Sequence, residues 1–255
     1  MPWNPDTYNK FKAERFAPFD DLLKLITVKP ELKIIDLGCG TGELTQKLAA
    51  YLPGAKLVLG IDSSAEMLQQ SEKFATENCV FKQQDIEAVL DEKEQWDLIF
   101  SNAALQWVAD HKKLFPRIIS MIKSSGQLAI QVPSNNDHYT HIAIKEIAGT
   151  EPYKSALQGW TRDTPVLSIE EYAQILFDNG AHAITVYEKA YPHILKDADA
   201  LAEWTSGTAL VPYLEKLPKD LHDSFIMEYK QRLYSRFPGN PVFYPFKRII
   251  MGASF

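Results

Sequence analysis

Cysteine is scarce in this sequence. Its two residues, Cys39 and Cys79, are too few for a disulfide scaffold and offer no zinc-binding pattern. Long apolar runs are also lacking, because no stretch approaches the roughly 18 residues that a membrane span needs. The N-terminus has no basic region followed by an apolar core, which a signal peptide would show. We therefore expect a cytoplasmic protein with no membrane partner and no bound metal.

Positive charge is not in excess either, since the formal net charge is −6. A protein of this charge is not expected to bind nucleic acid. Internal repeats and low-complexity tracts are absent. The 255 residues, 45% of them hydrophobic, suit one α/β domain with elaborations. We expect residues 1–255 to form a single domain that acts as a monomer.

Short apolar segments alternate with helical patterns along the first half of the chain. The expected strands are Lys33–Leu37, Leu57–Asp62, Val80–Gln84, Trp96–Asn102 and Gln127–Val132. The expected helices between them are Glu43–Tyr51, Ala65–Thr76 and Asp110–Ile122. This alternation predicts a doubly wound α/β fold with a mostly parallel sheet covered on both faces. Residues 183–187 and 246–253 add two more strands, which makes the sheet seven-stranded.

The flanking segments read as helical elaborations of this core. Residues 7–26 predict one amphipathic helix or two short ones, with Pro18 as a break, so residues 1–28 form a candidate lid. A further helix is expected over residues 168–178. Residues 192–245 predict a small helical cap over a ligand crevice, beside a ligand-binding core at 30–135. The alternative is that lid and cap simply pad the outside of the core.

The most informative motif is the run Asp36-Leu37-Gly38-Cys39-Gly40-Thr41-Gly42, which ends the first strand and opens a helix. Glycines there allow a tight turn and a close approach to a ligand. A dinucleotide fingerprint has the spacing G-x-G-x-x-G, but here the third glycine arrives one residue early. The acid at the strand end suits an ammonium group better than a pyrophosphate. S-adenosyl-L-methionine offers an ammonium group and no phosphate.

Acidic residues follow the next two strands as well. Asp62 ends the second strand, where a carboxylate can accept hydrogen bonds from both ribose hydroxyls. Asp85 and Ile86 follow the third strand, where they can bond the adenine amine and pack on its ring. Met67 can stack on the other face of the adenine. Met67 could equally be a core residue, and Asp85 could cap the next element.

In order and spacing, these three motifs resemble the class I S-adenosylmethionine-dependent methyltransferases over roughly residues 30–135. The resemblance implies a Rossmann-like fold and S-adenosyl-L-methionine as cofactor. It also implies a cofactor site. The expected cofactor-binding residues are Arg15, Asp36, Gly38, Gly40, Gly42, Asp62, Ser63, Met67, Asp85, Ile86, Asn102 and Leu105.

The loop after the fourth strand helps to distinguish among the kinds of methyltransferase that the sequence resembles. The Pro-Pro-aromatic motif of DNA and many amide methyltransferases is absent from Ser101–Trp107, which argues against methylation of base amines. Instead, several short motifs resemble the trans-aconitate methyltransferase family nearly end to end. They are Trp3–Pro5, Ala13–Arg15, Asn102–Trp107, Asp110–His111, Leu114–Pro116, Gln131–Pro133 and Phe246–Ile250. This likeness implies methyl transfer to a carboxylate oxygen of a small polycarboxylic acid.

A polycarboxylic acid needs cationic partners. The family carries Leu-Arg-Pro in the cap where this chain reads Leu210-Val211-Pro212, which leaves the exact acid open. The cations that could substitute are Arg15, Lys154, Arg162, Lys247 and Arg248. The other candidate substrate-binding residues are Tyr8, Gln106, Trp107, His111, Trp160 and Tyr213. Each of these has an ordinary structural alternative, as a surface charge or as packing between cap and core.

No catalytic base is required for such an acceptor, because a carboxylate is already ionised near neutral pH. We expect catalysis to rest on alignment and on exclusion of water. Two alternatives stay open at this point. One is a methyltransferase for another acceptor, such as a malonyl-carrier protein or a phenolic small molecule. The other is a non-catalytic protein that binds the cofactor.

Overall fold

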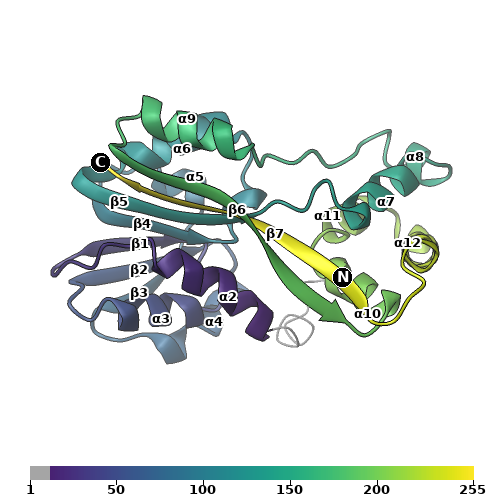
Figure 1. Cartoon of the computed structure of the whole chain (residues 1–255), viewed down its shortest axis with the longest axis horizontal. Helices are drawn as coiled ribbons and strands as arrows, with labels where there is room; N and C mark the ends of the chain where they lie inside the picture. Colours follow the sequence, from purple (N-terminus) through teal and green to yellow (C-terminus); the bar gives the residue numbers. More distant parts are fainter. Residues whose placement is uncertain (1–11) are drawn as a thin grey trace. The chain divides into compact units, whose positions relative to one another are not determined.

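The computed structural model describes residues 12–255, and side chains from Phe16 onward. The chain divides into two compact units that are described separately (Figure 1). The sheet unit comprises residues 16–133, 165–189 and 248–255, and the helical unit comprises residues 12–15, 134–164 and 190–247. No helix among residues 12–255 is long and apolar enough to cross a membrane.

The sheet has seven strands in the order β3-β2-β1-β4-β5-β7-β6. The strands are β1 (Lys33–Leu37), β2 (Leu57–Asp62), β3 (Cys79–Gln83), β4 (Trp96–Asn102), β5 (Ile122–Pro133), β6 (Ala183–Leu195) and β7 (Val242–Ser254). The pairs from β3 to β5 are parallel, whereas β5 and β7 run antiparallel. This mostly parallel, seven-stranded sheet confirms the predicted fold class.

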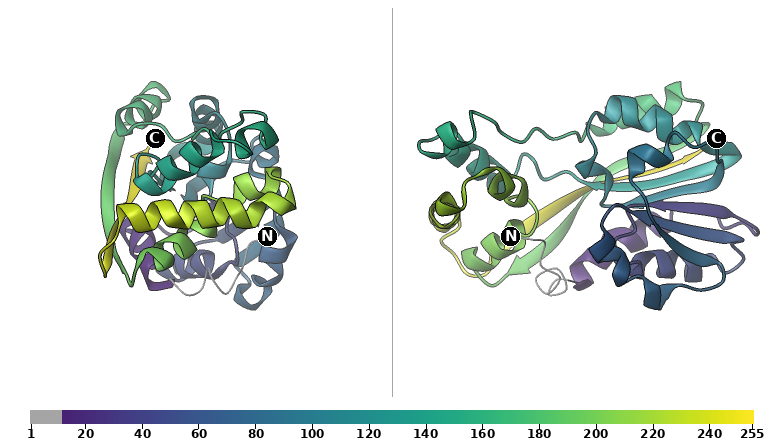
Figure 2. Two further views of the ribbon diagram at one scale, coloured as in Figure 1. Left: turned by 90° about the vertical axis from the view of Figure 1, so that its right-hand side faces the viewer. Right: turned by 180° about the vertical axis from the view of Figure 1, so that it is seen from behind.

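Helices cover both faces of the sheet. One face carries α2 (Lys12–Leu23), α3 (Glu43–Tyr51) and α4 (Ala65–Gln69) (Figures 1 and 2). The other face carries α5 (Ile86–Val89), α6 (His111–Ser120) and α9 (Ile169–Asp178), which bury the largest apolar core of the unit. The remaining short turns are the 3-10 helices η1 (Glu72–Phe74) and η2 (Leu105–Trp107). Because both faces are covered, the central strands β1 and β4 are almost entirely buried.

Two local predictions for this unit were wrong. Pro18 does not break the first helix but lies inside α2, where the neighbouring Phe19 and Leu22 are buried. The helix expected over residues 65–76 stops at Gln69, and η1 follows it. Ser71 lies between the two, buried, and its hydroxyl donates to the carbonyl of Leu68 at 2.7 Å. Such a side-chain bond to the backbone competes with helix continuation.

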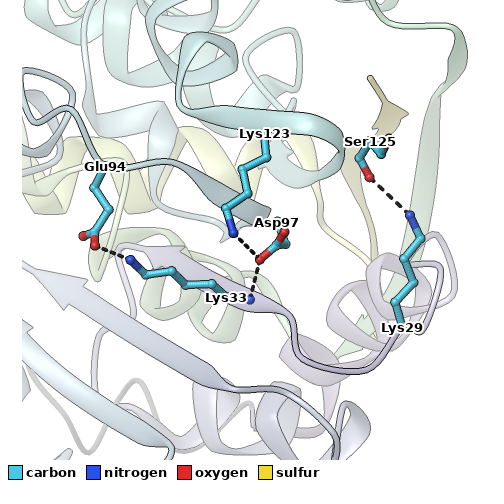
Figure 3. A network of polar contacts seen from close by, with 6 residues as sticks. All are labelled: Lys29, Lys33, Glu94, Asp97, Lys123 and Ser125. Carbon is cyan, nitrogen blue, oxygen red and sulfur yellow. Dashed lines mark hydrogen bonds and ion pairs between the residues drawn. The ribbon is translucent and has the colours of Figure 1, made fainter.

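A polar network ties β1 to β4 at their amino ends, opposite the glycine loop (Figure 3). One Asp97 carboxylate oxygen accepts hydrogen bonds from the backbone N–H of Lys33 and from Lys123 Nζ, both at 2.8 Å. Burial alone would raise the pKa of Asp97, but these two partners lower it below its usual value. Lys33 Nζ also pairs with Glu94, and Lys29 Nζ donates to the Ser125 carbonyl at 3.2 Å. The network fixes the strand register far from the candidate site.

The helical unit has its own apolar core. Its helices are α7 (Tyr139–Ala148), α8 (Tyr153–Ala156), α10 (Ala198–Ser206), α11 (Val211–Lys216), η3 (Lys219–Leu221) and α12 (His222–Arg236). Helix α12 packs against α7 and α10 (Figure 2). The cap was predicted from residues 192–245 alone, but residues 134–164 belong to the same unit, and α7 and α8 were not predicted. The role of residues 192–245 as a cap over a ligand crevice stays a prediction.

Candidate functional site

The glycine loop leaves the carboxyl end of β1 and leads into α3. Gly38, Gly40 and Gly42 all have positive φ, at 82°, 56° and 78°. An L side chain rarely adopts this conformation, so the turn requires glycine. The backbone N–H groups of Gly38 and Cys39 both donate to the Ile61 carbonyl at 2.9 Å, which ties the loop to the end of β2. The loop is therefore held at the edge where parallel strands end.

Space also requires these glycines. A Cβ at Gly38 would lie 2.1 Å from the Cβ of Ala104, and one at Gly42 would lie 2.7 Å from the Cβ of Ser71. At Gly40 the nearest atom is the methyl group of Met67, 3.1 Å away. Met67 is half-buried, so its side chain reaches the loop instead of entering the core. That position is compatible with the predicted adenine contact.

Asp62 is oriented by two backbone donors. Its Oδ2 accepts a hydrogen bond from the Gly40 N–H, and its Oδ1 accepts one from the Ser64 N–H, each at 2.9 Å. Ser64 in turn caps α4 by accepting from the Met67 N–H at 3.2 Å, and Ser63 is exposed. A carboxylate has about four acceptor positions, so two remain for a ribose diol.

Asp85 serves as the N-cap of α5, the structural role that the sequence left open. Its Oδ1 accepts from the Glu87 N–H at 2.7 Å, and the carboxylate is exposed. The neighbouring Ile86 is half-buried, and its Cδ1 lies 3.9 Å from the position of a Cβ at Gly38. The pair therefore adjoins the glycine loop. One carboxylate can both cap a helix and accept from an amine, since its acceptor positions are not exhausted.

Asp36 lies below the loop and is only 3% exposed. Thr45 on α3 donates its hydroxyl hydrogen to Asp36 Oδ2 at 2.6 Å. Burial raises the pKa of Asp36 from 3.8 to about 7; the bond from Thr45 opposes the shift and the charge of Asp62 adds to it. A buried carboxyl of this kind favours a cationic partner, which would stabilise its charged form. The ammonium group of a methionine moiety is such a partner.

The end of β4 carries the last two predicted cofactor residues. The Asn102 side chain is half-buried, and its Oδ1 accepts a hydrogen bond from Gln131 Nε2 at 2.8 Å. The next residue, Ala103, has a φ of 58°, so the chain turns sharply and brings Ala104 over Gly38. Leu105 is fully buried beneath this turn, where it belongs to the core of the sheet unit. The Leu105 side chain therefore supports the turn after β4 from the core side.

His111 differs from the expectation that it binds the substrate. The side chain is 1% exposed, and both ring nitrogens are used inside the protein. Nε2 lies 2.9 Å from the Leu105 carbonyl, so it carries the hydrogen, and Nδ1 lies 2.5 Å from the hydroxyl of Tyr172. Burial lowers the pKa of His111 below its usual value. The two contacts tie the loop after β4 to Tyr172 of α9.

The other candidate substrate residues are spread over both units. Gln106 donates to the Ala103 carbonyl at 2.7 Å, and Trp107 is 52% exposed. In the helical unit, the rings of Trp160 and Tyr213 are 5.1 Å apart, and the Tyr213 hydroxyl accepts from the backbone N–H of Arg162 at 3.1 Å. Tyr8 lies outside the described residues, and so does the side chain of Arg15.

Three polar residues around the site had no assigned role in the sequence reading. Thr45 bonds Asp36, Ser101 donates its hydroxyl hydrogen to the Leu37 carbonyl at 2.7 Å, and Gln131 bonds Asn102. All three are buried. A polar residue within a buried apolar segment is the signal that could have singled them out, because such groups are retained only with a partner.

The residues present fit S-adenosyl-L-methionine. Three acidic residues, Asp36, Asp62 and Asp85, lie at or near the carboxyl ends of the neighbouring strands β1, β2 and β3. A pyrophosphate would be repelled by this arrangement, whereas a ligand with a sulfonium, an ammonium and a ribose diol matches it. Asp62 would hold the ribose and Asp36 would face the ammonium.

Comparison with known proteins agrees with this chemistry. Residues 28–198 match the family described as "Methyltransferase domain". The chain therefore belongs to the methyltransferases, and its cofactor is S-adenosyl-L-methionine.

Individual relatives indicate which kind of methyltransferase the chain is similar to. The chain is 42% identical to a trans-aconitate 2-methyltransferase of Deinococcus radiodurans, over 100% of this chain and 98% of the relative. It is 35% identical to one of Variovorax paradoxus, over 93% and 91%. Among solved structures, the YcgJ protein of Bacillus subtilis matches with a TM-score of 0.61 at 16% identity, over 94% and 98%, which shows the shared fold alone. The enzyme is thus trans-aconitate 2-methyltransferase-like.

Proposed function

We propose that this enzyme transfers the methyl group of S-adenosyl-L-methionine to a carboxylate oxygen of a small polycarboxylic acid related to trans-aconitate. The observation that carries the proposal is the similarity, over the whole chain, to relatives named trans-aconitate 2-methyltransferase. The acceptor is left broader than trans-aconitate because Val211 replaces the arginine of the family pattern in the cap. Val211 begins helix α11 of the helical unit.

The contacts of His111, at the end of the loop after β4, are compatible with an acceptor that needs no catalytic base. When bound, the cofactor supplies a methyl group on a positively charged sulfur, which leaves as a neutral thioether. A carboxylate is ionised near neutral pH and attacks without losing a proton. His111, the histidine nearest to this loop in sequence, has both ring nitrogens engaged and is not free to act as a base.

The remaining work of the protein is alignment. The glycine loop and Asp62 fix the cofactor, and Asp36 fixes its ammonium end. Alignment of donor and acceptor can contribute about 7–11 kcal/mol in favourable cases. Gln106 and Trp107, both in the sheet unit, are proposed to contact the acid. The enzyme is proposed to act as a monomer in the cytoplasm.

The test is an acceptor assay with radiolabelled cofactor. The enzyme is incubated with trans-aconitate, other di- and tricarboxylic acids, a malonyl-carrier protein and a set of phenols. We expect label in a base-labile methyl ester of a small acid. Label confined to phenols or to the carrier protein would overturn the proposed acceptor. Cofactor binding by calorimetry without any transfer would favour a non-catalytic binding protein instead.

A further inference from the structure

Three neighbouring strands contribute side chains to one chain of hydrogen bonds at the end of the sheet. Arg248 on β7 donates from Nη1 to Gln131 Oε1 on β5 at 3.0 Å. Gln131 then donates from Nε2 to Asn102 Oδ1 on β4 at 2.8 Å. Gln131 is 1% exposed and Arg248 is 7% exposed. All three residues belong to the sheet unit.

The strand registers place the Asn102 end of this series of hydrogen bonds beside the glycine loop. Asp36 on β1 is paired with Phe100 on β4, and Asn102 lies two residues further along β4. Side chains two residues apart point to the same face of a strand, so Asn102 shares the face of Asp36. It lies beyond the last residue of β1, where the glycine loop begins. Gln131 is paired with Asn102 and extends the same face.

The direction of these hydrogen bonds is dictated by Arg248. A guanidinium group has only donors, so the oxygen of the Gln131 amide must face it. The Gln131 amide nitrogen then faces Asn102, and a nitrogen of this kind only donates. The oxygen of Asn102 must therefore face Gln131. As a result, the NH2 group of Asn102 is turned away from Gln131 and is left to donate elsewhere at the strand end.

The positive charge of Arg248 also strengthens the donor. Each hydrogen bond in a chain polarises the next one, and the effect is larger where water is excluded. The two buried links thus make the Asn102 N–H groups better donors to a negatively charged oxygen. A neutral amide that is fixed and polarised in this way binds a carboxylate without placing a free cation beside the sulfonium.

We infer that Arg248 and Gln131 are positioning residues which fix Asn102 as a hydrogen-bond donor to a carboxylate. This inference rests on the proposed function, in which the carboxylate belongs to the acid substrate. The methionine moiety of the cofactor is the other source of the same chemistry, and the experiment below separates the two.

The decisive variant is Gln131→Glu. Glutamate keeps the size of the side chain and the contact with Arg248, but its oxygens only accept. Asn102 must then reverse its amide and present Oδ1 to the ligand. We expect the KM for the acid to rise roughly tenfold or more, because a charge-assisted hydrogen bond is replaced by repulsion. The dissociation constant for S-adenosyl-L-methionine, for which Asn102 is also a candidate residue, should change less than the KM for the acid.

A matched control exists on the same strand. Gln127 is also buried on β5, four residues before Gln131, but its amide bonds the backbone of Thr27. Gln127→Glu should lower stability without raising the KM. A second variant, Asn102→Asp, accepts from Gln131 as before and presents an oxygen to the ligand. It should reproduce the rise in KM even where Gln131→Glu folds poorly.

The outcomes separate the possible failures. A rise in the cofactor dissociation constant with an unchanged KM for the acid keeps the positioning role and assigns the carboxylate to the cofactor. If the wild-type enzyme methylates no carboxylic acid, the proposed function fails, and the cofactor affinity alone tests the inference. Unchanged KM and unchanged cofactor affinity in folded Gln131→Glu and Asn102→Asp would overturn it.

Discussion

The buried carboxyl of Asp36 predicts an unusual dependence of stability on pH. Its pKa is raised by burial to about 7, while the unfolded chain keeps the ordinary value of 3.8. Below the unfolded value both states are protonated, and the carboxyl has no effect. As the pH rises from about 4 to 7, the unfolded state loses the proton and the folded state retains it, so stability falls. Above about pH 7 both states are ionised and the loss is complete.

The size of the effect follows from the two pKa values. About 1.4 kcal/mol for each pKa unit gives a total cost of about 4 kcal/mol at pH 8. Asp36→Asn removes this cost, because an amide does not ionise and its oxygen still accepts the bond from Thr45. We therefore expect Asp36→Asn to be more stable than the wild type at pH 8. The difference should shrink by about 1.4 kcal/mol per pH unit between pH 7 and 5.

The assay is urea unfolding of the cofactor-free protein at several pH values between 5 and 8.5. Asp220→Asn serves as the control, because Asp220 is an exposed carboxylate and its removal should shift stability little at any pH. The same Asp36→Asn variant should bind S-adenosyl-L-methionine more weakly, since the ammonium loses its carboxylate. Stability curves for wild type and Asp36→Asn that run parallel from pH 5 to 8 would refute the reasoning.

Three further variants test other parts of the structure. Gly38→Ala forces a side chain into a positive φ and against Ala104, so we expect stability to fall by about 1–3 kcal/mol and cofactor binding to weaken. Gly207→Ala, where nothing lies within 4 Å of the added Cβ, should change neither stability nor cofactor binding. Asp62→Ala should raise the cofactor dissociation constant at least tenfold by calorimetry, and unchanged affinity would contradict the ribose assignment. Burial lowers the pKa of His141 from 6.5 to about 4, so the protein loses stability as the pH falls between these values. In His141→Gln, the stability measured by urea unfolding should fall less over this pH range. An unaltered loss of stability between pH 6.5 and 4 would count against this prediction.

The strand ends that carry the candidate cofactor residues were predictable because they follow from local signals. Each strand from β1 to β4 is short, and the candidate residue lies at or near its carboxyl end. The carboxyl ends of parallel strands lie at one edge, so Asp36, Asp62 and Asp85 had to come close together. The glycine spacing added a steric requirement that the backbone of Gly38 and Gly42 fulfils, since both have positive φ.

The failed predictions have a different physical origin. The helix over residues 65–76 was expected from its N-cap and from the absence of a breaker. Its actual end is imposed by tertiary packing, since Ser71 is buried against Gly42 and bonds the Leu68 carbonyl. Pro18 breaks no helix, although its missing N–H costs helix stability. The burial of Phe19, whose ring meets that of Phe100 edge to face at a centroid distance of 5.8 Å, offsets this cost.

The proposed acceptor half of the site is harder to predict, because its residues come from distant parts of the sequence. Arg248 and Gln131 are 117 residues apart, and Gln131 and Asn102 are 29 apart. No local pattern joins them. The parallel pairing of β4 with β5 places Asn102 opposite Gln131, and the antiparallel insertion of β7 beside β5 brings Arg248 near Gln131. In the sequence, Arg248 is one of several cations, and any of them could face a carboxylate. Once the strand order is known, the donor-only guanidinium of Arg248 determines how the amides of Gln131 and Asn102 are oriented. The Gln131→Glu exchange tests whether that orientation matters for binding of the acid.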